Sequence, residues 1–206
     1  MELKQVIEKR MSIRSFTNEE VNESDLKEMV RRAGLAPTLN NSQPWKFIAI
    51  TNKSKLKEMA ELVISKLSDL PLRLDEIGQK RQLTKVEWYS TFFENAPSLI
   101  ALIMKPHETD LDKSVNLSHD DIIQLRNYPD LQSAGASIQN ILLSAVDLGY
   151  GACWLSGPMI AKEELQKYLG IESPWHLIAF VAIGKPFGYP NRPSKKGIDE
   201  IFTIIR

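Results

Sequence analysis

Apolar residues recur along the chain at spacings that distinguish helices from strands. The clearest helical pattern covers residues 131–148, where apolar residues recur at steps of three and four positions. These residues are Leu131, Ala134, Ile138, Ile141, Ala145 and Leu148. Gly149 and Gly151 follow and are expected to end the helix. We expect a buried central helix, although the same repeat suits a helix that contacts a second subunit.

Shorter amphipathic patterns predict four more helices, over residues 2–11, 22–34, 54–67 and 161–169. In the first of them, Leu3, Val6 and Ile7 share one face. Residues 71–95 are less regular but contain a cluster of four aromatic residues, which are Trp88, Tyr89, Phe92 and Phe93. These rings belong either to the core or to the wall of a pocket for an aromatic ligand.

Five apolar runs predict strands. Residues 98–104 form a continuous apolar run after Pro97, which is typical of a strand buried on both faces. The other runs cover residues 45–50, 152–155, 175–183 and 201–205. We expect the strand at 45–50 to be largely buried, and 201–205 to be the last strand. The mixed order of helices and strands indicates an α/β or α+β fold with helices covering one sheet.

Length and charge limit the classes of function. A chain of 206 residues is most simply one domain, here with an excursion at residues 105–130 that is either a lid or poorly ordered. Lys and Arg together number 26, as do Asp and Glu, so no basic excess indicates nucleic-acid binding. The first residues lack the apolar core of a signal peptide, and no apolar run approaches the ~18 residues of a membrane span. We therefore expect a cytoplasmic protein with neither nucleic acid nor membrane as partner.

The cysteine and histidine content gives no sign of a metal site. Cys153 is the only cysteine, so an intrachain disulfide or a thiolate cluster is not possible. His107, His119 and His176 show none of the close spacings at which pairs of histidines bind metals. We predict no metal.

A polar loop lies between Pro37 and Pro44. It holds the short polar side chains of Thr38, Asn40, Asn41, Ser42 and Gln43. Such a loop can present amide and hydroxyl hydrogen bonds to a flat ligand rich in heteroatoms. The alternative is an ordinary connection from a helix to a strand.

The sequence contains no G-x-G-x-x-G, P-loop or G-x-S-x-G motif, so a bound cofactor is the better candidate to carry any chemistry. Basic residues suited to a phosphate are present. Arg10 and Arg14 flank Ser12, and Lys195 and Lys196 stand in a proline-bounded tail. Guanidinium groups bind phosphate through paired hydrogen bonds. Each basic pair taken alone could equally be a solvated surface.

Four segments, taken in order, resemble the FMN-dependent nitroreductase family. They are R-x-S-x-R-x-F from Arg10 to Phe16, A-P-T-x-x-N-x-Q-P-W ending at Trp45, the stretch 147–157, and A-I-G-K-P ending at Pro186. The resemblance implies a nitroreductase-like α+β fold with a mainly antiparallel sheet covered by helices. It also implies a homodimer in which the C-terminal strand is exchanged between subunits, with FMN at the interface.

The resemblance also implies roles for individual residues. Arg10 and either Lys195 or Lys196 would hold the FMN phosphate with help from Ser12. Arg14 would reach the ribityl chain or the O2 edge of the ring. The backbone amides of Ser156 and Gly157 would face N5 and O4. The remaining residues would line the ring or be offered by the partner subunit, and these are Pro37, Thr38, Leu39 and Asn41.

The implied activity is that of a flavoprotein oxidoreductase with a ping-pong mechanism. Hydride would pass from NADH or NADPH through flavin N5 to a nitroaromatic, a quinone or a similar electrophile, with Arg14 as the electrostatic stabiliser. The chain departs from the family in Thr38-Leu39, where Ser-Ser or Ser-x is common. It also has Trp88, Tyr89 and Phe92 where many members place Asn or Lys.

Other functions remain open within this resemblance. A specialised relative, either a reductive dehalogenase or a flavin-fragmenting enzyme, is one alternative. The other is a protein that binds FMN or senses redox state without turnover.

Overall fold

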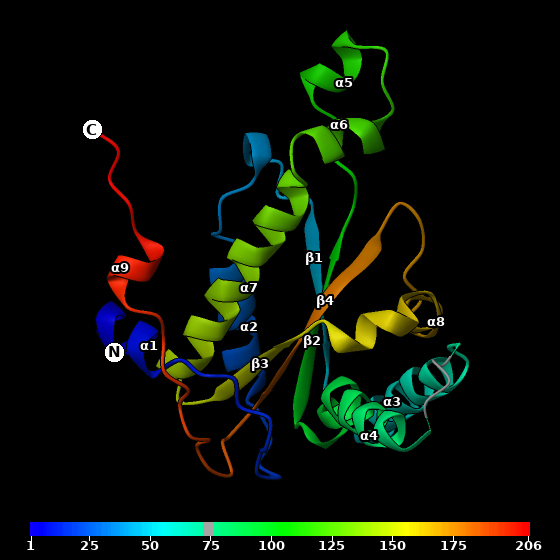
Figure 1. Cartoon of the computed structure of the whole chain (residues 1–206), viewed down its shortest axis with the longest axis vertical. Coiled ribbons are helices and arrows are strands. Elements are labelled where there is room, and N and C mark those ends of the chain that lie inside the picture. The colour runs from blue at the N-terminus through cyan, green and yellow to red at the C-terminus, as the bar shows by residue number, and fades with distance from the viewer. Residues whose placement is uncertain (72–75) are drawn as a thin grey trace.

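A four-stranded antiparallel sheet forms the centre of the fold (Figure 1). The computed structural model describes residues 1–71 and 76–206, and the side chains of residues 1–71 and 82–206. The strand order is β1-β2-β4-β3. The strands are β1 (Trp45–Ile50), β2 (Ser98–Met104), β3 (Gly151–Leu155) and β4 (His176–Gly184). The predicted class, helices around a mainly antiparallel sheet, is confirmed.

Strand β2 is buried along its whole length, as its continuous apolar run predicts. Successive side chains of a strand point to opposite faces, so the strand contributes to two cores. Leu99 and Ala101 belong to one apolar cluster, whereas Ile100 and Leu102 belong to the other. The sheet is therefore the middle layer of three.

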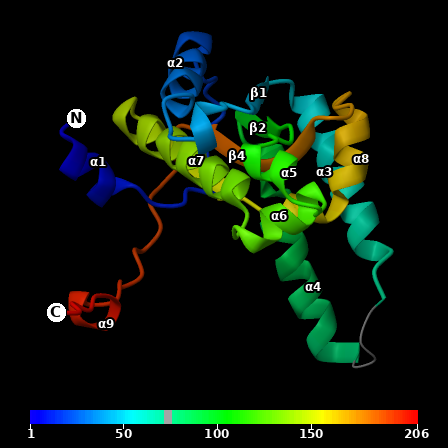
Figure 2. The same cartoon turned by 90° about the horizontal axis from the view of Figure 1, so that it is seen from above.

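Helices cover both faces of the sheet, as the view from above shows (Figure 2). Helices α2 (Glu23–Ala33) and α7 (Pro129–Asp147) pack against each other and fill one core. Helices α3 (Lys53–Ser68) and α8 (Lys162–Tyr168) fill the other. The end of helix α4 (Glu76–Thr91) and the short turn η2 (Phe92–Asn95) close that second core.

The central helix α7 confirms the strongest periodic pattern of the sequence. Pro129 opens it at a position where a missing N–H costs nothing. Ala134, Ile138 and Ile141 are buried, but Leu131 at its start is 52% exposed. The apolar stripe thus continues beyond the surface that one chain covers.

The segment between β2 and α7 is ordered and contains two short helices, α5 (Asp110–Ser114) and α6 (His119–Leu125). Each begins with a capping box, in which Thr109 pairs with Asp112 and Ser118 pairs with Asp121. The excursion therefore has secondary structure of its own, and its role as a lid stays a prediction.

Two expectations about burial or strand formation are wrong. The tail forms helix α9 (Ile198–Ile201) followed by residues 202–206, which are not a strand in this single chain. Strand β1 has only Ile50 buried, because Phe47 and Ala49 on one of its faces line an open cavity. In helix α1 (Leu3–Lys9), Val6 is buried but Leu3 and Ile7 are exposed.

Within the described part of the chain, helices of the length and apolarity needed to cross a membrane do not occur.

Candidate functional site

Two segments distant in sequence enclose a cavity of about 420 Å³. The connection after α1 supplies Arg10, Ser12 and Arg14, and the C-terminal tail supplies Arg192 and Lys195. The structure therefore brings together four of the residues predicted to bind a phosphate. Lys196 is not among the residues that line this cavity.

The connection after α1 lies along the outer edge of β3, which fixes the place of its side chains. Ser12 forms a parallel bridge with Ala152, and the N–H of Ile13 donates to the carbonyl of Ala152 at 3.0 Å. Gly151 makes this approach possible, because a Cβ at that position would lie 2.7 Å from the Ile13 side chain. Ser12 and Arg14 are therefore held by backbone contacts on either side of a buried residue.

The cavity carries an excess of positive charge. Among the side chains that the structure describes, no carboxylate forms an ion pair with Arg10, Arg14 or Lys195. Glu8 also lines the cavity, but its ion pair is with Lys4 at 3.9 Å. With Arg192, four cations and a hydroxyl line one space, and together they are a donor set for an anion such as a phosphate group.

Arg192 is a wall residue that sequence reasoning missed. Its Nη2 donates to the backbone carbonyl of Arg10 at 3.0 Å, which ties the tail to the connection after α1. The available signal was its position between Pro190 and Pro193, three residues before Lys195, in the same rigid tail.

Arg14 interacts with an aromatic ring and with a buried thiol. Its guanidinium carbon is 5.4 Å from the centroid of the Tyr89 ring. Burial raises the pKa of the Cys153 thiol, while the charge of Arg14 and a hydrogen bond with Ser12 partly oppose that shift. Cys153 is thus neutral, and it leaves the charge of Arg14 unpaired.

Ser156 and Gly157 follow β3 and are exposed. Gly157 begins the turn η3 (Gly157–Ala161), and a Cβ there would lie 2.7 Å from Ser90 Oγ. Ser90 is the neighbour of Tyr89 in the last turn of α4. The last turn of α4 therefore contacts both Arg14 and Gly157. It links the residues predicted near the phosphate and ring edge with those predicted near N5 and O4.

The polar loop has an unusual backbone. Asn40, Asn41 and Gln43 adopt positive φ angles of 52°, 51° and 46°, a region that asparagine tolerates better than most residues. The N–H of Gln43 donates to Thr38 Oγ1 at 3.1 Å, which holds the loop closed. The buried hydroxyl of Ser42 has no hydrogen-bond partner among the described residues. A loop held in such conformations is typical of a binding site.

Within one chain, the polar loop does not contact the cationic cavity, which is the cavity lined by Arg10, Ser12, Arg14, Arg192 and Lys195. It contacts α7 through the turn η1 (Leu39–Asn41) and lies beside the first half of that helix (Figure 1). The connection after α1 lies at the other end, where α7 leads into β3 (Figure 1). Because α7 has 19 residues, the two ends are about 28 Å apart. Pro37, Thr38, Leu39 and Asn41 therefore form a second, separate half of the predicted site.

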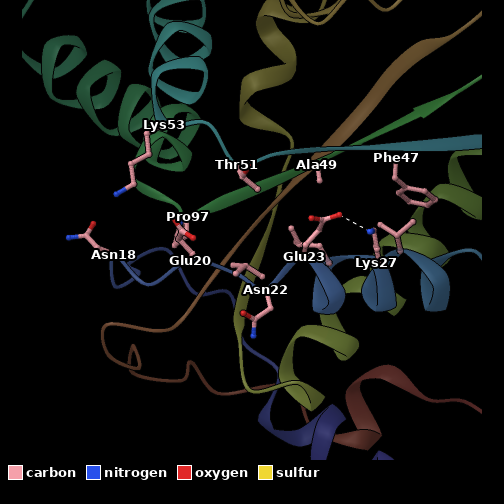
Figure 3. Close-up of a pocket in the computed structure, with 13 residues that line it drawn as sticks. Asn18, Glu20, Asn22, Glu23, Lys27, Phe47, Ala49, Thr51, Lys53 and Pro97 are labelled. Atoms are coloured by element: carbon pink, nitrogen blue, oxygen red, sulfur yellow. Dashed lines mark ion pairs between the residues drawn. The ribbon is translucent and has the colours of Figure 1, made fainter.

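A larger cavity of about 850 Å³ opens between α2 and β1 (Figure 3). Phe47 and Ala49 line it from the strand, Thr51 lines it just after the strand, and Glu23 and Lys27 line it from the helix. Those two form an ion pair of 2.6 Å (Figure 3). None of the residues predicted to bind a cofactor lies on this wall.

Among the described residues, no group of three His, Cys, Asp or Glu side chains is placed to hold a metal ion.

Comparison with known proteins gives consistent results over the whole chain. The sequence profile described as Nitroreductase family matches residues 7–185. The chain is similar to the crystal structure of a BluB-like flavoprotein from Clostridium difficile 630, with a TM-score of 0.86, 31% identity and 100% coverage of both chains. The fold is also that of a nitroreductase with bound FMN from Desulfitobacterium hafniense DCB-2, with a TM-score of 0.73, 22% identity and coverage of 100% and 99%. An iodotyrosine deiodinase from Hydra vulgaris is 27% identical over 187 residues, which cover 89% of this chain and 63% of that protein.

Proposed function

Because the chain belongs to the nitroreductase family, we propose that it is an FMN-dependent oxidoreductase that uses NADH or NADPH to reduce a nitroaromatic, a quinone or a similar electrophile. The observation that carries this proposal is the cavity in which Arg10, Ser12, Arg14 and Lys195 converge, with no ion pair between these cations and a described carboxylate. Positive charge left unpaired at the wall of a cavity favours an anionic ligand.

The chemistry of these donors suits the phosphate of FMN. Arg10 and Lys195 would neutralise a phosphate that carries close to two negative charges, and the Ser12 hydroxyl would donate to one of its oxygens. Arg192 supports this arrangement through its hydrogen bond to the Arg10 carbonyl.

When bound, FMN would supply hydride transfer from the nicotinamide to the acceptor. The protein's own contribution to this chemistry is electrostatic. The Arg14 guanidinium would stabilise the negative charge that reduction places on the ring edge, because the neutral Cys153 thiol does not pair with its charge. The exposed backbone amides of Ser156 and Gly157 would donate hydrogen bonds to the opposite edge of the ring.

A homodimer would complete the site. Each chain carries the cationic cavity at one end of α7 and the polar loop at the other. The two halves of the site in one chain therefore cannot contact the same ligand. A two-fold arrangement would bring the loop with Pro37, Thr38, Leu39 and Asn41 to the cavity of the partner subunit.

The exposed tail supports the same proposal. Ile201, Phe202, Ile204 and Ile205 are all exposed in the single chain. Strand β1 is the outer strand of the sheet and lies beside the cavity of Figure 3. An added strand from the tail of the partner subunit would pair with the β1 backbone and place alternate side chains in that cavity.

The cofactor is tested by the absorbance spectrum of the purified protein, with a heat-released supernatant compared with FMN and FAD. We expect flavin bands in the near-ultraviolet and blue, and about one FMN per subunit. A colourless protein that does not take up added FMN would overturn the proposal.

Turnover is tested by following NADH and NADPH oxidation with and without a quinone. An oxidoreductase shows consumption that depends on the acceptor, whereas a protein that only stores FMN shows none.

A second candidate function is reductive dehalogenation, which the similarity to iodotyrosine deiodinase favours. The relevant measurement is iodide release from iodotyrosine by the FMN-loaded, reduced protein. Release at a rate comparable with quinone reduction would favour the dehalogenase. Its absence would leave the nitroreductase activity as the proposal.

A further inference from the structure

The strongest feature not used by the proposed mechanism is the contact between Arg14 and Tyr89. The guanidinium carbon lies 5.4 Å from the ring centroid, within the ~6 Å at which a cation is attracted to the face of an aromatic ring. The two residues are 75 positions apart in sequence and belong to different elements. Their contact therefore depends on the placement of the last turn of α4 over the connection after α1.

Tyr89 is 43% exposed, but its ring packs against other aromatic rings. Trp88 packs against it edge-on at 4.8 Å between ring centroids, and Trp88 in turn lies 5.7 Å from the ring of Phe92. Phe92 is buried in the core that α3 and α8 fill. This chain of rings gives Tyr89 a fixed position on an otherwise exposed turn.

Arg14 has no charged partner among the described side chains. It interacts with the Cys153 thiol, which is neutral and therefore a weak partner. An arginine without a charged partner can change rotamer and turn towards water. The face of Tyr89 is thus a second contact that restricts the guanidinium.

We propose that Tyr89 is a positioning residue that holds the Arg14 guanidinium at the flavin and so raises the reduction potential of bound FMN. This inference rests on the proposed function, because it needs FMN in the cavity. The aromatic face performs this task and the phenolic hydroxyl does not. The family resemblance gives Arg14 its place beside the ring, and the contact seen here adds the residue that keeps it there.

The test compares the FMN midpoint potential in four proteins: wild type, Tyr89→Phe, Tyr89→Leu and Trp88→Leu. We expect Tyr89→Phe to match wild type, because the ring face is kept. Tyr89→Leu should favour the oxidised cofactor by about tenfold, which for a two-electron couple is a fall of ~30 mV. Trp88→Leu removes an aromatic side chain of the same helical turn and should lower the potential less than Tyr89→Leu does.

A double-mutant cycle separates positioning from a general effect on the fold. The shift caused by Tyr89→Leu should disappear in an Arg14→Ala background. An equal shift in both backgrounds would overturn the inference, as would a fall in Tyr89→Phe as large as that in Tyr89→Leu. These outcomes differ from failure of the proposed function, in which wild type itself binds no FMN.

Discussion

Arg10 stands at the wall of the cationic cavity, where its charge has no carboxylate partner among the described side chains. Arg10→Ala should therefore weaken FMN binding without unfolding the protein. Loss of hydrogen bonds to a charged phosphate costs ~1.5–3 kcal/mol, so the dissociation constant should rise by about 10- to 100-fold. Fluorescence titration of apoprotein with FMN measures this change.

Lys196→Ala is the matched control, because Lys196 follows Lys195 but does not line the cavity. It should change the FMN dissociation constant by less than a factor of two to three. Full retention of FMN by Arg10→Ala would place the phosphate elsewhere.

Gly157 lies where the backbone after β3 passes close to Ser90 of α4. A Cβ there would lie 2.7 Å from Ser90 Oγ and 3.1 Å from Ser90 Cα, so the backbone of one segment must move. Overpacking of this kind costs ~1–3 kcal/mol, and Gly157→Ala should lower the urea midpoint accordingly. Gly188→Ala is the control, because nothing lies within 4 Å of its added Cβ. Equal stability of the two variants would contradict the contact.

Individual site residues differ in how well the sequence could identify them. Arg10, Ser12 and Arg14 are predictable as a group because they fall within five positions. That Lys195, and not Lys196, lines the cavity depends on the path of the tail, which no local pattern gives. The contact of Tyr89 with Arg14 is likewise set by the packing of α4 on the core.

At the scale of elements, Asp112 is the residue that organises the segment of α5 and α6. It accepts hydrogen bonds from the N–H and hydroxyl of Thr109, at 2.7 and 2.6 Å, and it pairs with His119 at 2.6 Å. These bonds, those of Thr109 first, hold the pKa of the Asp112 carboxyl well below its usual range. A carboxylate whose pKa is lowered in the folded state stabilises the fold at pH values above its pKa in the unfolded chain, which is about 3.9 for Asp. That stabilisation is lost as the pH falls towards and through the lower pKa of the folded state.

Acidification below about pH 4 should therefore loosen residues 110–125 before the sheet. Hydrogen exchange of these amides, corrected for intrinsic rates, measures the effect. Asp112→Asn should show the looser segment already at pH 7 and a flatter dependence on pH. Asp110→Asn, an exposed carboxyl of the same helix, is the control and should behave as wild type. Exchange in Asp112→Asn that matches wild type at every pH would contradict this role.

Elements whose pattern reflects burial inside one chain were predicted well. The continuous run of β2 predicted the strand and its burial, and the three-to-four spacing of α7 predicted the helix and most of its buried side chains, Leu131 excepted. The errors concern apolar residues that the single chain leaves uncovered, such as Leu131 and the tail after Ile201. Periodicity indicates which side chains avoid water, but it does not identify the surface that covers them.

At the scale of the whole molecule, one chain has both halves of the predicted site but keeps them at opposite ends of α7. The same chain exposes an apolar tail and leaves the outer edge of β1 unpaired by any described strand. The proposed homodimer would account for both features, since a second copy related by two-fold symmetry would supply each missing part. Site formation and dimer formation should therefore be coupled.

Removal of residues 198–206 tests this coupling. The deleted segment includes Phe202 and Ile204, which are 59% and 61% exposed in the single chain, and Ile205, which is 95% exposed. Full burial of such a side chain contributes ~1.5–3 kcal/mol, and the dimer would contain each of them twice. We expect the dimer dissociation constant, measured by analytical ultracentrifugation, to rise at least about a hundredfold. FMN affinity should fall with it, because the polar loop would no longer be held at the cavity. Deletion of Arg206 alone is the control and should leave both quantities unchanged. A truncated protein that dimerises as tightly as the full chain would mean that β1 is covered by some other segment.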